Sequence, residues 1–155
     1  MVVVGIDPGT ATVGYSFVTG TKKDPNILDF GVLQTLPQPA DMMPQRLLEI
    51  AQDLEQLLDI HKPTHAVIEE LFFFKNAKTV ISVAQSRGMI LYLLAKRGVS
   101  ILGLTPLQVK LSLCSYGRAD KKQVQSMVQK VYKLQTLPTP DDAADSLAMA
   151  WCGLR

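Results

Sequence analysis

The sequence has few of the residues that mark metal modules and disulfide-stapled scaffolds. Its 155 residues include only two cysteines, Cys114 and Cys152, and two histidines. The cysteines show neither the spacing of metal ligands nor a disulfide framework, which argues against a zinc module or a stapled secreted domain. Cys152 falls in an apolar helical stretch, so we expect an ordinary core residue of a protein in a reducing compartment.

Long apolar runs, repeats and linkers are also missing. No run reaches the ~18 residues that a membrane span needs, and the first residues lack the basic segment of a secretory signal. The 47% hydrophobic content is too high for a disordered chain. We therefore expect a single domain over residues 1–155, with no membrane segment and a cytoplasmic location.

Net charge is small, but it is unevenly distributed. Residues 1–92 hold seven Lys or Arg and ten Asp or Glu, whereas residues 93–155 hold nine and four. A basic second half favours a polyanion as the partner, although an ordinary solvated surface would give the same counts.

The hydrophobic pattern predicts a mixed α/β fold. The expected strands cover residues 2–7, 12–18, 27–33, 65–70 and 99–104, and the expected helices cover 41–62, 78–97, a short segment from 106, 121–134 and 141–152. Short turns join the first three strands, which indicates an antiparallel meander. The last two strands each follow a helix, so we expect them to pair in parallel, giving a five-stranded mixed sheet flanked by helices.

Helix starts are marked by their first residues. Asp41 is placed to cap the first helix, and Asp120 with Gln123 resembles a capping box. Thr105-Pro106 and Thr139-Pro140 each predict an N-cap followed by proline in the first helical position.

Two apolar segments exceed what one small core needs. Residues 72–74 are three successive phenylalanines, of which we expect at least one to be exposed and suited to stacking on an unpaired base; two of them could instead pack on the core. The helix over residues 78–97 is apolar on every side in its second half. We expect one face in the core and the other in a homodimer, with a wholly buried central helix as the alternative.

Acidic residues stand where strands and a helix would bring them together. Asp7 ends the first strand, Glu69 and Glu70 end the fourth, and Asp142 and Asp145 share one helix face. Carboxylates gathered at one sheet edge repel each other unless cations bind, and an all-oxygen set favours Mg²⁺ or Mn²⁺. Two such ions promote phosphodiester hydrolysis. The alternatives are that Asp7 caps its own turn and that the helix acids offset the helix dipole.

Four segments in order, residues 5–10, 66–76, 85–88 and 141–148, resemble the RuvC family of Holliday-junction resolvases. The resemblance covers essentially the whole chain and implies an RNase H-like fold. It also implies a crossover junction endodeoxyribonuclease that acts in recombination and repair. Such an enzyme is a homodimer that nicks four-way DNA junctions symmetrically with Mg²⁺, two ions per site, for which Mn²⁺ can substitute. A partnership with the RuvA–RuvB branch-migration complex is implied as well.

The same resemblance assigns residues to roles. It implies that the metal carboxylates are Asp7, Glu69, Asp142 and Asp145, with Glu69 preferred to Glu70 because it directly follows the apolar strand. The DNA-binding residues expected on this basis are Phe72, Lys75, Lys110, Arg118, Lys121 and Lys122.

Two other classes of protein remain open. Residues 5–10 also resemble the phosphate loop of actin-like ATPases, but that fold needs two domains around its nucleotide. An inactive junction-binding module is the other alternative, and the four acids argue against it because carboxylates repel DNA phosphates.

Overall fold

The computed structural model describes residues 1–9, 11–35, 42–70 and 77–155. A five-stranded sheet with the strand order β3-β2-β1-β4-β5 forms its centre. The strands are β1 (Val3–Asp7), β2 (Thr12–Gly20), β3 (Pro25–Gln34), β4 (His65–Glu69) and β5 (Ser100–Leu104). β1 pairs antiparallel with β2 and β2 with β3, whereas β4 pairs in parallel with β1 and β5 in parallel with β4. The predicted mixed sheet is confirmed, with β1 in its middle.

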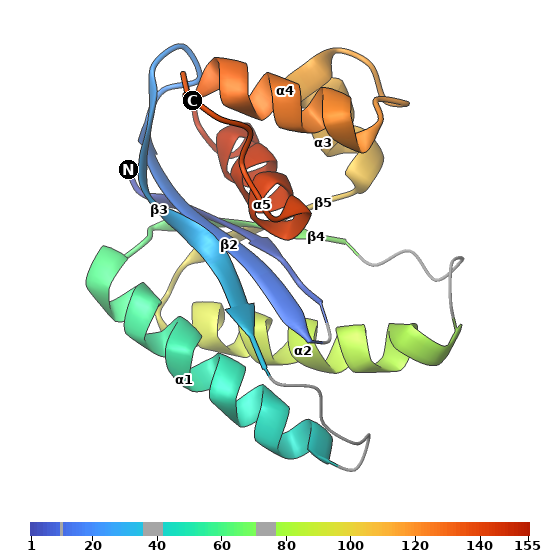
Figure 1. The fold of residues 1–155 in the computed structure, drawn as a ribbon. Coiled ribbons are helices and arrows are strands. Elements are labelled where there is room, and N and C mark those ends of the chain that lie inside the picture. Colours follow the sequence, from blue (N-terminus) through green and yellow to red (C-terminus); the bar gives the residue numbers. More distant parts are fainter. Residues whose placement is uncertain (10, 36–41, 71–76) are drawn as a thin grey trace.

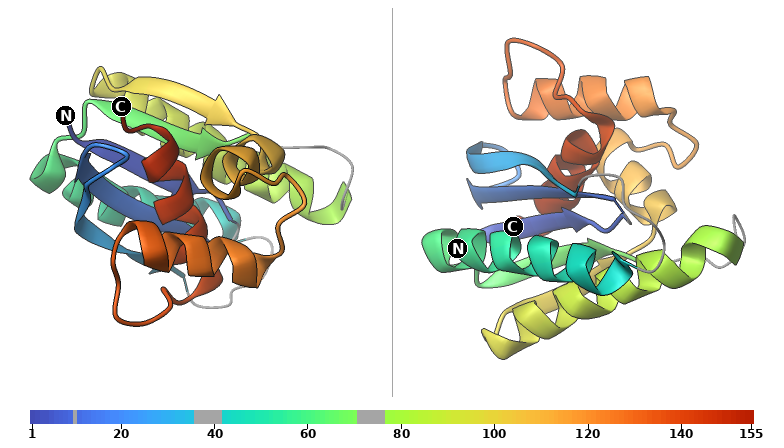
Figure 2. Two further views of the ribbon diagram at one scale, coloured as in Figure 1. Left: turned by 90° about the horizontal axis from the view of Figure 1, so that it is seen from above. Right: turned by 60° about the horizontal axis from the view of Figure 1, so that its bottom comes forward.

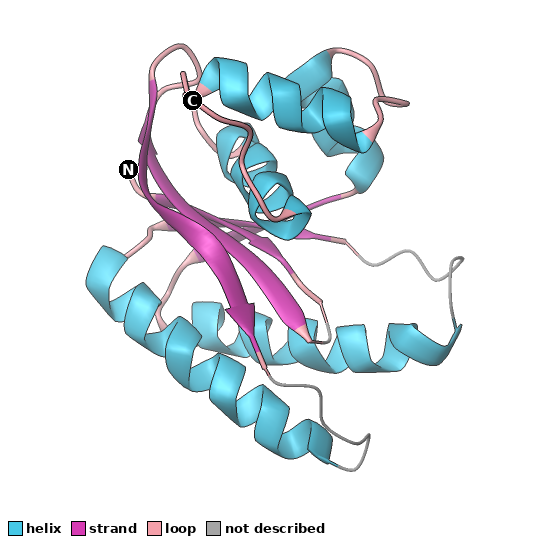
Figure 3. Ribbon diagram, in the orientation of Figure 1, coloured by secondary structure: helices cyan, strands magenta, loops and turns pink. Residues whose placement is uncertain are grey.

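Helices cover both faces of the sheet (Figure 1). They are α1 (Met43–His61), α2 (Ala77–Lys96), α3 (Pro106–Cys114), α4 (Lys121–Val131) and α5 (Asp141–Cys152). α1 and α2 lie on one face, and α5 lies on the other with α3 and α4 beside it, as the two turned views of Figure 2 also show. Figure 3 shows the strands sandwiched between these two layers of helices.

The pleat of the strands divides the core into two clusters. Val4 and Ile6 of β1 belong to the cluster under α1 and α2, and Val3 belongs to the cluster under α5. Because side chains alternate along a strand, Gly5 and Asp7 share the face of Val3. A Cβ atom on Gly5 would lie 2.0 Å from the Ser146 carbonyl oxygen, so glycine here lets α5 pack directly on the central strand.

The helix boundaries confirm two of the expected caps and correct a third. Thr105 and Asp120 both form capping boxes with the residue three positions later. Pro140, not Thr139, is the N-cap of α5, and no side chain caps this helix, since a proline at the N-cap itself has no side-chain acceptor. α4 ends at Val131, three residues before the expected Leu134. The expected cap Asp41 lies outside the described residues. Among the helices of the described ranges, none is long and apolar enough to cross a bilayer.

Candidate active site

Two carboxylates stand at the ends of neighbouring parallel strands. The β1–β4 pairing runs from Val3–His65 to Ile6–Ile68, and Asp7 and Glu69 follow the last pair. Parallel strands end at the same sheet edge, so the two acids lie side by side, and their side chains are hydrogen-bonded. The residues around them are apolar because β1 and β4 are internal strands of the sheet.

Helix α5 brings two more acids to this edge. Asp142 and Asp145 lie in its first turns, and both are partly buried. Small buried residues on the same helix, including Ala143 and Ala144, allow the close approach to the sheet. A Cβ on Gly14 of β2 would lie 2.0 Å from the Asp142 carbonyl oxygen, so this glycine fixes how near α5 comes.

Burial and mutual repulsion hold Asp7 in its protonated form. The pKa of Asp7 is raised to about 9, first because burial disfavours the charged carboxylate and then because Glu69 lies beside it; Asp145 and Asp142 repel it further. The protonated carboxyl of Asp7 donates its hydrogen to Glu69. Two adjacent carboxyls share one proton here. A cation could replace that proton and bind the same carboxyl oxygens.

Asp145 responds to the same group of charges. Its pKa is raised to about 6, principally by burial, while Lys121 opposes the shift and Glu69, Asp141 and Asp142 add to it. The charges of the strand-end acids and of the α5 acids therefore affect one another's pKa.

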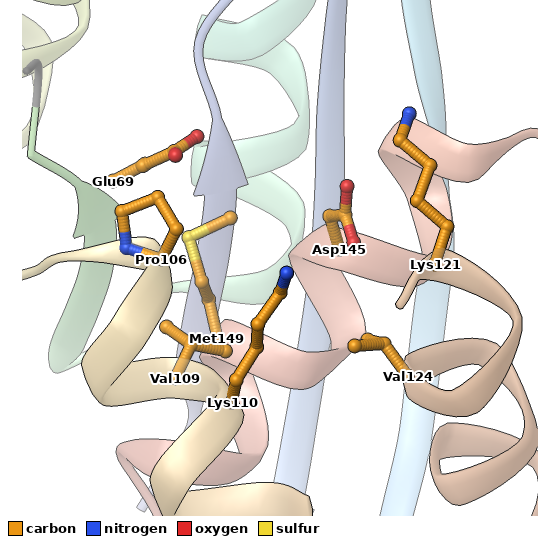
Figure 4. Close-up of a pocket in the computed structure, with 8 residues that line it drawn as sticks. All are labelled: Glu69, Pro106, Val109, Lys110, Lys121, Val124, Asp145 and Met149. Carbon is orange, nitrogen blue, oxygen red and sulfur yellow. The ribbon is translucent and has the colours of Figure 1, made fainter. Parts of the chain in front are cut away.

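A cavity of about 200 Å³ opens beside these acids. Its lining residues are Glu69, Pro106, Val109, Lys110, Lys121, Val124, Asp145 and Met149. Figure 4 shows Lys110 extending from α3 toward the space between Glu69 and Asp145, with Lys121 on the other side of Asp145. The cavity thus has an apolar floor and a rim of two carboxylates and two ammonium groups, a combination suited to a substrate with both phosphate and apolar parts.

Lys121 is held in place by a residue of α5. Its Nζ lies 3.2 Å from Asp141 Oδ2, and Gln125 Nε2 donates to the other oxygen of Asp141 at 2.8 Å. The hydrogen bond from Lys121 to Asp141 and the negative charge of Asp141 raise the pKa of Lys121, and Asp145 and Asp142 contribute less. Lys121 therefore stays charged next to the acids.

The remaining predicted residues fall in several places. Glu69 lines the cavity, whereas Glu70 is exposed and packs its side chain against Gly103 at the β5 edge. Arg118 is exposed on the connection between α3 and α4, and Lys122 lines a separate hollow with Tyr116. Phe72 and Lys75 lie outside the described residues.

Sequence reasoning missed two polar residues. Asp141 was interpreted only through the helix dipole, but it also carries the ion pair to Lys121. Arg87 was noted only as part of a motif, but its Nε donates to the main-chain oxygen of Glu69 at 3.0 Å. No spacing in the sequence signals either contact, because both join segments that become neighbours only when the chain folds.

The four carboxylates Asp7, Glu69, Asp142 and Asp145 are the type of ligand that a hard divalent cation prefers. All four are oxygen donors, which Mg²⁺ and Mn²⁺ prefer, and a cation would relieve the repulsion that raises the pKa of Asp7. As the side chains lie, no three Asp, Glu, His or Cys residues within the described ranges form a complete ligand set.

The fold and the site together define a class: an RNase H-like protein with carboxylates at the carboxyl ends of its central strands. The family model described as "Crossover junction endodeoxyribonuclease RuvC" matches residues 3–153. A relative of that name from Syntrophomonas wolfei is 50% identical over 155 residues, covering 99% of this chain and 88% of its own length. One from Fusobacterium nucleatum is 48% identical and covers 96% of this chain and 77% of its own length.

Solved structures agree with the sequence comparisons. Thermus thermophilus RuvC in complex with a Holliday junction substrate superposes with a TM-score of 0.89 at 31% identity, covering 97% of this chain and 91% of that one. The chain belongs to the RuvC family of crossover junction endodeoxyribonucleases.

Proposed function

We propose that this chain resolves four-way DNA junctions by paired symmetric nicks, as part of recombination and repair. The observation that supports this most directly is the group of carboxyls around Asp7 at one sheet edge, with Lys110 and Lys121 across the adjoining cavity. Hydrolysis of a phosphodiester uses both features: carboxylates that hold cations next to the reacting phosphorus, and positive charge around the phosphate oxygens. Membership of the family supplies the reaction and the substrate class.

The proposed ligands for two Mg²⁺ ions are Asp7, Glu69, Asp142 and Asp145, whose side chains would close on the ions as these bind. Bound ions supply Lewis acidity for the attacking water and for the departing oxygen, so no protein nucleophile is required. Mn²⁺ shares the preference for oxygen ligands and is expected to substitute.

The chain's own residues bind and orient the strand. Lys110 and Lys121 are placed to contact the phosphates beside the scissile bond, and the apolar floor formed by Val109 and Met149 suits a sugar or base face. By resemblance to the family, Phe72, Lys75, Arg118 and Lys122 extend this contact along the junction arms.

Cleavage of a synthetic four-way junction beside a linear duplex of matched sequence tests the function. Paired nicks in the junction alone, requiring Mg²⁺ and lost in EDTA, are the expected result. Tight junction binding without cleavage would indicate an inactive binding module. Absence of both binding and cleavage would contradict the proposal.

Lys121→Ala is expected to weaken junction binding and to make binding less dependent on salt. One lost phosphate contact should reduce the slope of log affinity against log salt by about 1, because roughly one counterion fewer is released. The measurement is fluorescence anisotropy across a salt series. Lys130→Ala, on the same helix but outside the cavity lining, is the matched control. An unchanged slope in Lys121→Ala would count against the contact.

We further propose that α2 joins two copies into a homodimer. The exposed residues along one side of this helix include the polar Gln85 and an apolar set that we call the α2 outer face: Ile81, Ala84, Gly88, Tyr92 and Ala95. Ile81 is 68% and Tyr92 64% exposed, and a Cβ on Gly88 would meet no atom within 4 Å. Large apolar side chains beside small ones at helical spacing suit close packing against a second helix. Two copies would give the two active sites that paired nicks need.

Placing a charge on the α2 outer face is expected to yield a monomer. Ile81→Glu with Tyr92→Glu would bury two carboxylates in the contact, which is unfavourable without partners. Sedimentation velocity at micromolar concentration measures the result. Leu48→Glu, at a 57% exposed position on α1, should leave the dimer intact. A monomeric unmodified protein would refute the proposed dimer.

The expectation of a RuvA–RuvB partnership and of a cytoplasmic location rests on resemblance to the family. Co-purification from cells that contain the branch-migration complex would test the first, and fractionation the second.

A further inference from the structure

Arg87 is the residue of the 85–88 motif that reaches the candidate active site. It projects from α2 and is partly buried, and its Nε donates to the main-chain oxygen of Glu69 at 3.0 Å. No carboxylate in the described part of the chain lies within ion-pair distance of its guanidinium. Its direct contact in this region is therefore with the backbone of Glu69 and not with a carboxylate.

The geometry of the sheet explains why this carbonyl needs an outside donor. The amide of Glu70 donates to Leu104 of β5 at 2.9 Å. In a trans peptide the carbonyl points opposite to the following N–H, so the Glu69 oxygen points away from β5 and toward β1. Its natural partner is therefore an amide of the segment that follows Asp7.

That segment offers no amide at the required position. The amide of His65 donates to Val2, and in a parallel ladder this phase repeats every two residues. Following it along the strands, the Glu69 carbonyl would accept from residue 8. Residue 8 is Pro8, which has no N–H. Arg87 supplies the hydrogen bond that Pro8 cannot, at the point where β1 and β4 deliver Asp7 and Glu69.

We propose that Arg87 is a positioning residue: it completes the ladder at Glu69 and thereby fixes the direction in which the Glu69 carboxylate leaves the strand. This rests on the proposed function, since it takes Glu69 as a metal ligand. Residues that orient metal ligands typically change metal affinity or activity by about 10- to 100-fold when removed. Loss of Arg87 should therefore weaken metal binding while junction binding through the lysines persists.

The test compares Arg87→Ala and Arg87→Lys with Arg97→Ala. Arg97 directly follows α2 and forms ion pairs with Asp59 and Glu55 of α1, not with the acids of the candidate site. It therefore controls for the loss of a partly buried arginine. Mn²⁺ binding to the DNA-free protein is measured by electron paramagnetic resonance. The Mg²⁺ concentration for half-maximal junction cleavage is measured separately, below the thermal midpoint of every variant.

We expect Arg87→Ala to bind Mn²⁺ about tenfold or more weakly and to need correspondingly more Mg²⁺ for cleavage. Its junction affinity in Ca²⁺ should be unchanged. Arg87→Lys retains an N–H donor and should recover part of the loss, and Arg97→Ala should match the unmodified protein in both metal measurements. Mn²⁺ binding and Mg²⁺ requirement unchanged in Arg87→Ala would overturn the proposal. If the unmodified protein fails to cut junctions, or if Asp7→Asn cuts them at the unmodified rate, the proposed function itself fails.

Discussion

Asp7→Asn is expected to abolish junction cleavage while leaving junction binding intact. The substitution keeps the shape of the side chain and removes one anionic ligand at the centre of the carboxyl group. Metal-ion catalysis contributes several kcal/mol of transition-state stabilisation, so the cleavage rate should fall by about a thousandfold or more. Binding should persist, because Asp7 is already uncharged in the metal-free protein and the lysines placed to contact DNA are unchanged.

Single-turnover cleavage and anisotropy on the same junction measure the two effects separately. Asp53→Asn, an exposed acid on α1, is the matched control and should cut at the unmodified rate. If Asp7→Asn cleaves normally in Mg²⁺, Asp7 is not a metal ligand and the site must lie elsewhere. If it neither binds nor cuts, the substitution has damaged the fold, which thermal unfolding would reveal.

Metal-free protein is expected to lose stability as the pH rises. The pKa of Asp7 is about 9 in the folded protein against an ordinary value of 3.8, so between these values the folded state holds a proton that the unfolded state has released. The free energy of unfolding must then fall with rising pH. Asp145, with a folded pKa of about 6, adds to the fall in the lower part of this range.

The expected size is large because each pH unit inside the window costs about 1.4 kcal/mol per proton. Between pH 5 and 8 the loss should be on the order of 4–5 kcal/mol, most of it from Asp7, measured by urea unfolding in EDTA. Asp7→Asn cannot ionise, so it should lose much less and be more stable than the unmodified protein at pH 8. Adding Mg²⁺ at pH 8 should restabilise the unmodified protein alone. Equal pH slopes for the two proteins would contradict the shifted pKa.

The order and pairing of the strands could be predicted because they depend on local patterns. The short turns between the first three strands force antiparallel pairing, and the helix before residues 65–70 forces a crossover to parallel pairing. Helix ends were less predictable. Pro140 occupies the N-cap of α5 although Thr139-Pro140 has the signature of an N-cap and first helical residue. In the structure the Pro140 carbonyl accepts the first hydrogen bonds of this helix, from the amides of Ala143 and Ala144.

The site was predictable as far as it consists of strand ends and one helix face. The positions of Asp7 and Glu69 follow from the apolar runs before them, and those of Asp142 and Asp145 from helical spacing. The choice of Glu69 over Glu70 came from the resemblance to the RuvC family, and the structure places Glu69 in the cavity lining and Glu70 against Gly103. Short-range periodicity carries this information, so folding adds little to it.

The sequence by itself determined the sheet, the family and the acids around Asp7, because each is written in residues close together in the chain or in motifs of fixed order. Only the tertiary structure decided which residues support those acids. The pairing of Lys121 with Asp141 and the reach of Arg87 to the Glu69 carbonyl join segments about 20 residues apart. Such contacts depend on how helices cross a sheet edge and on which backbone groups the strands leave unpaired, and periodicity does not encode these.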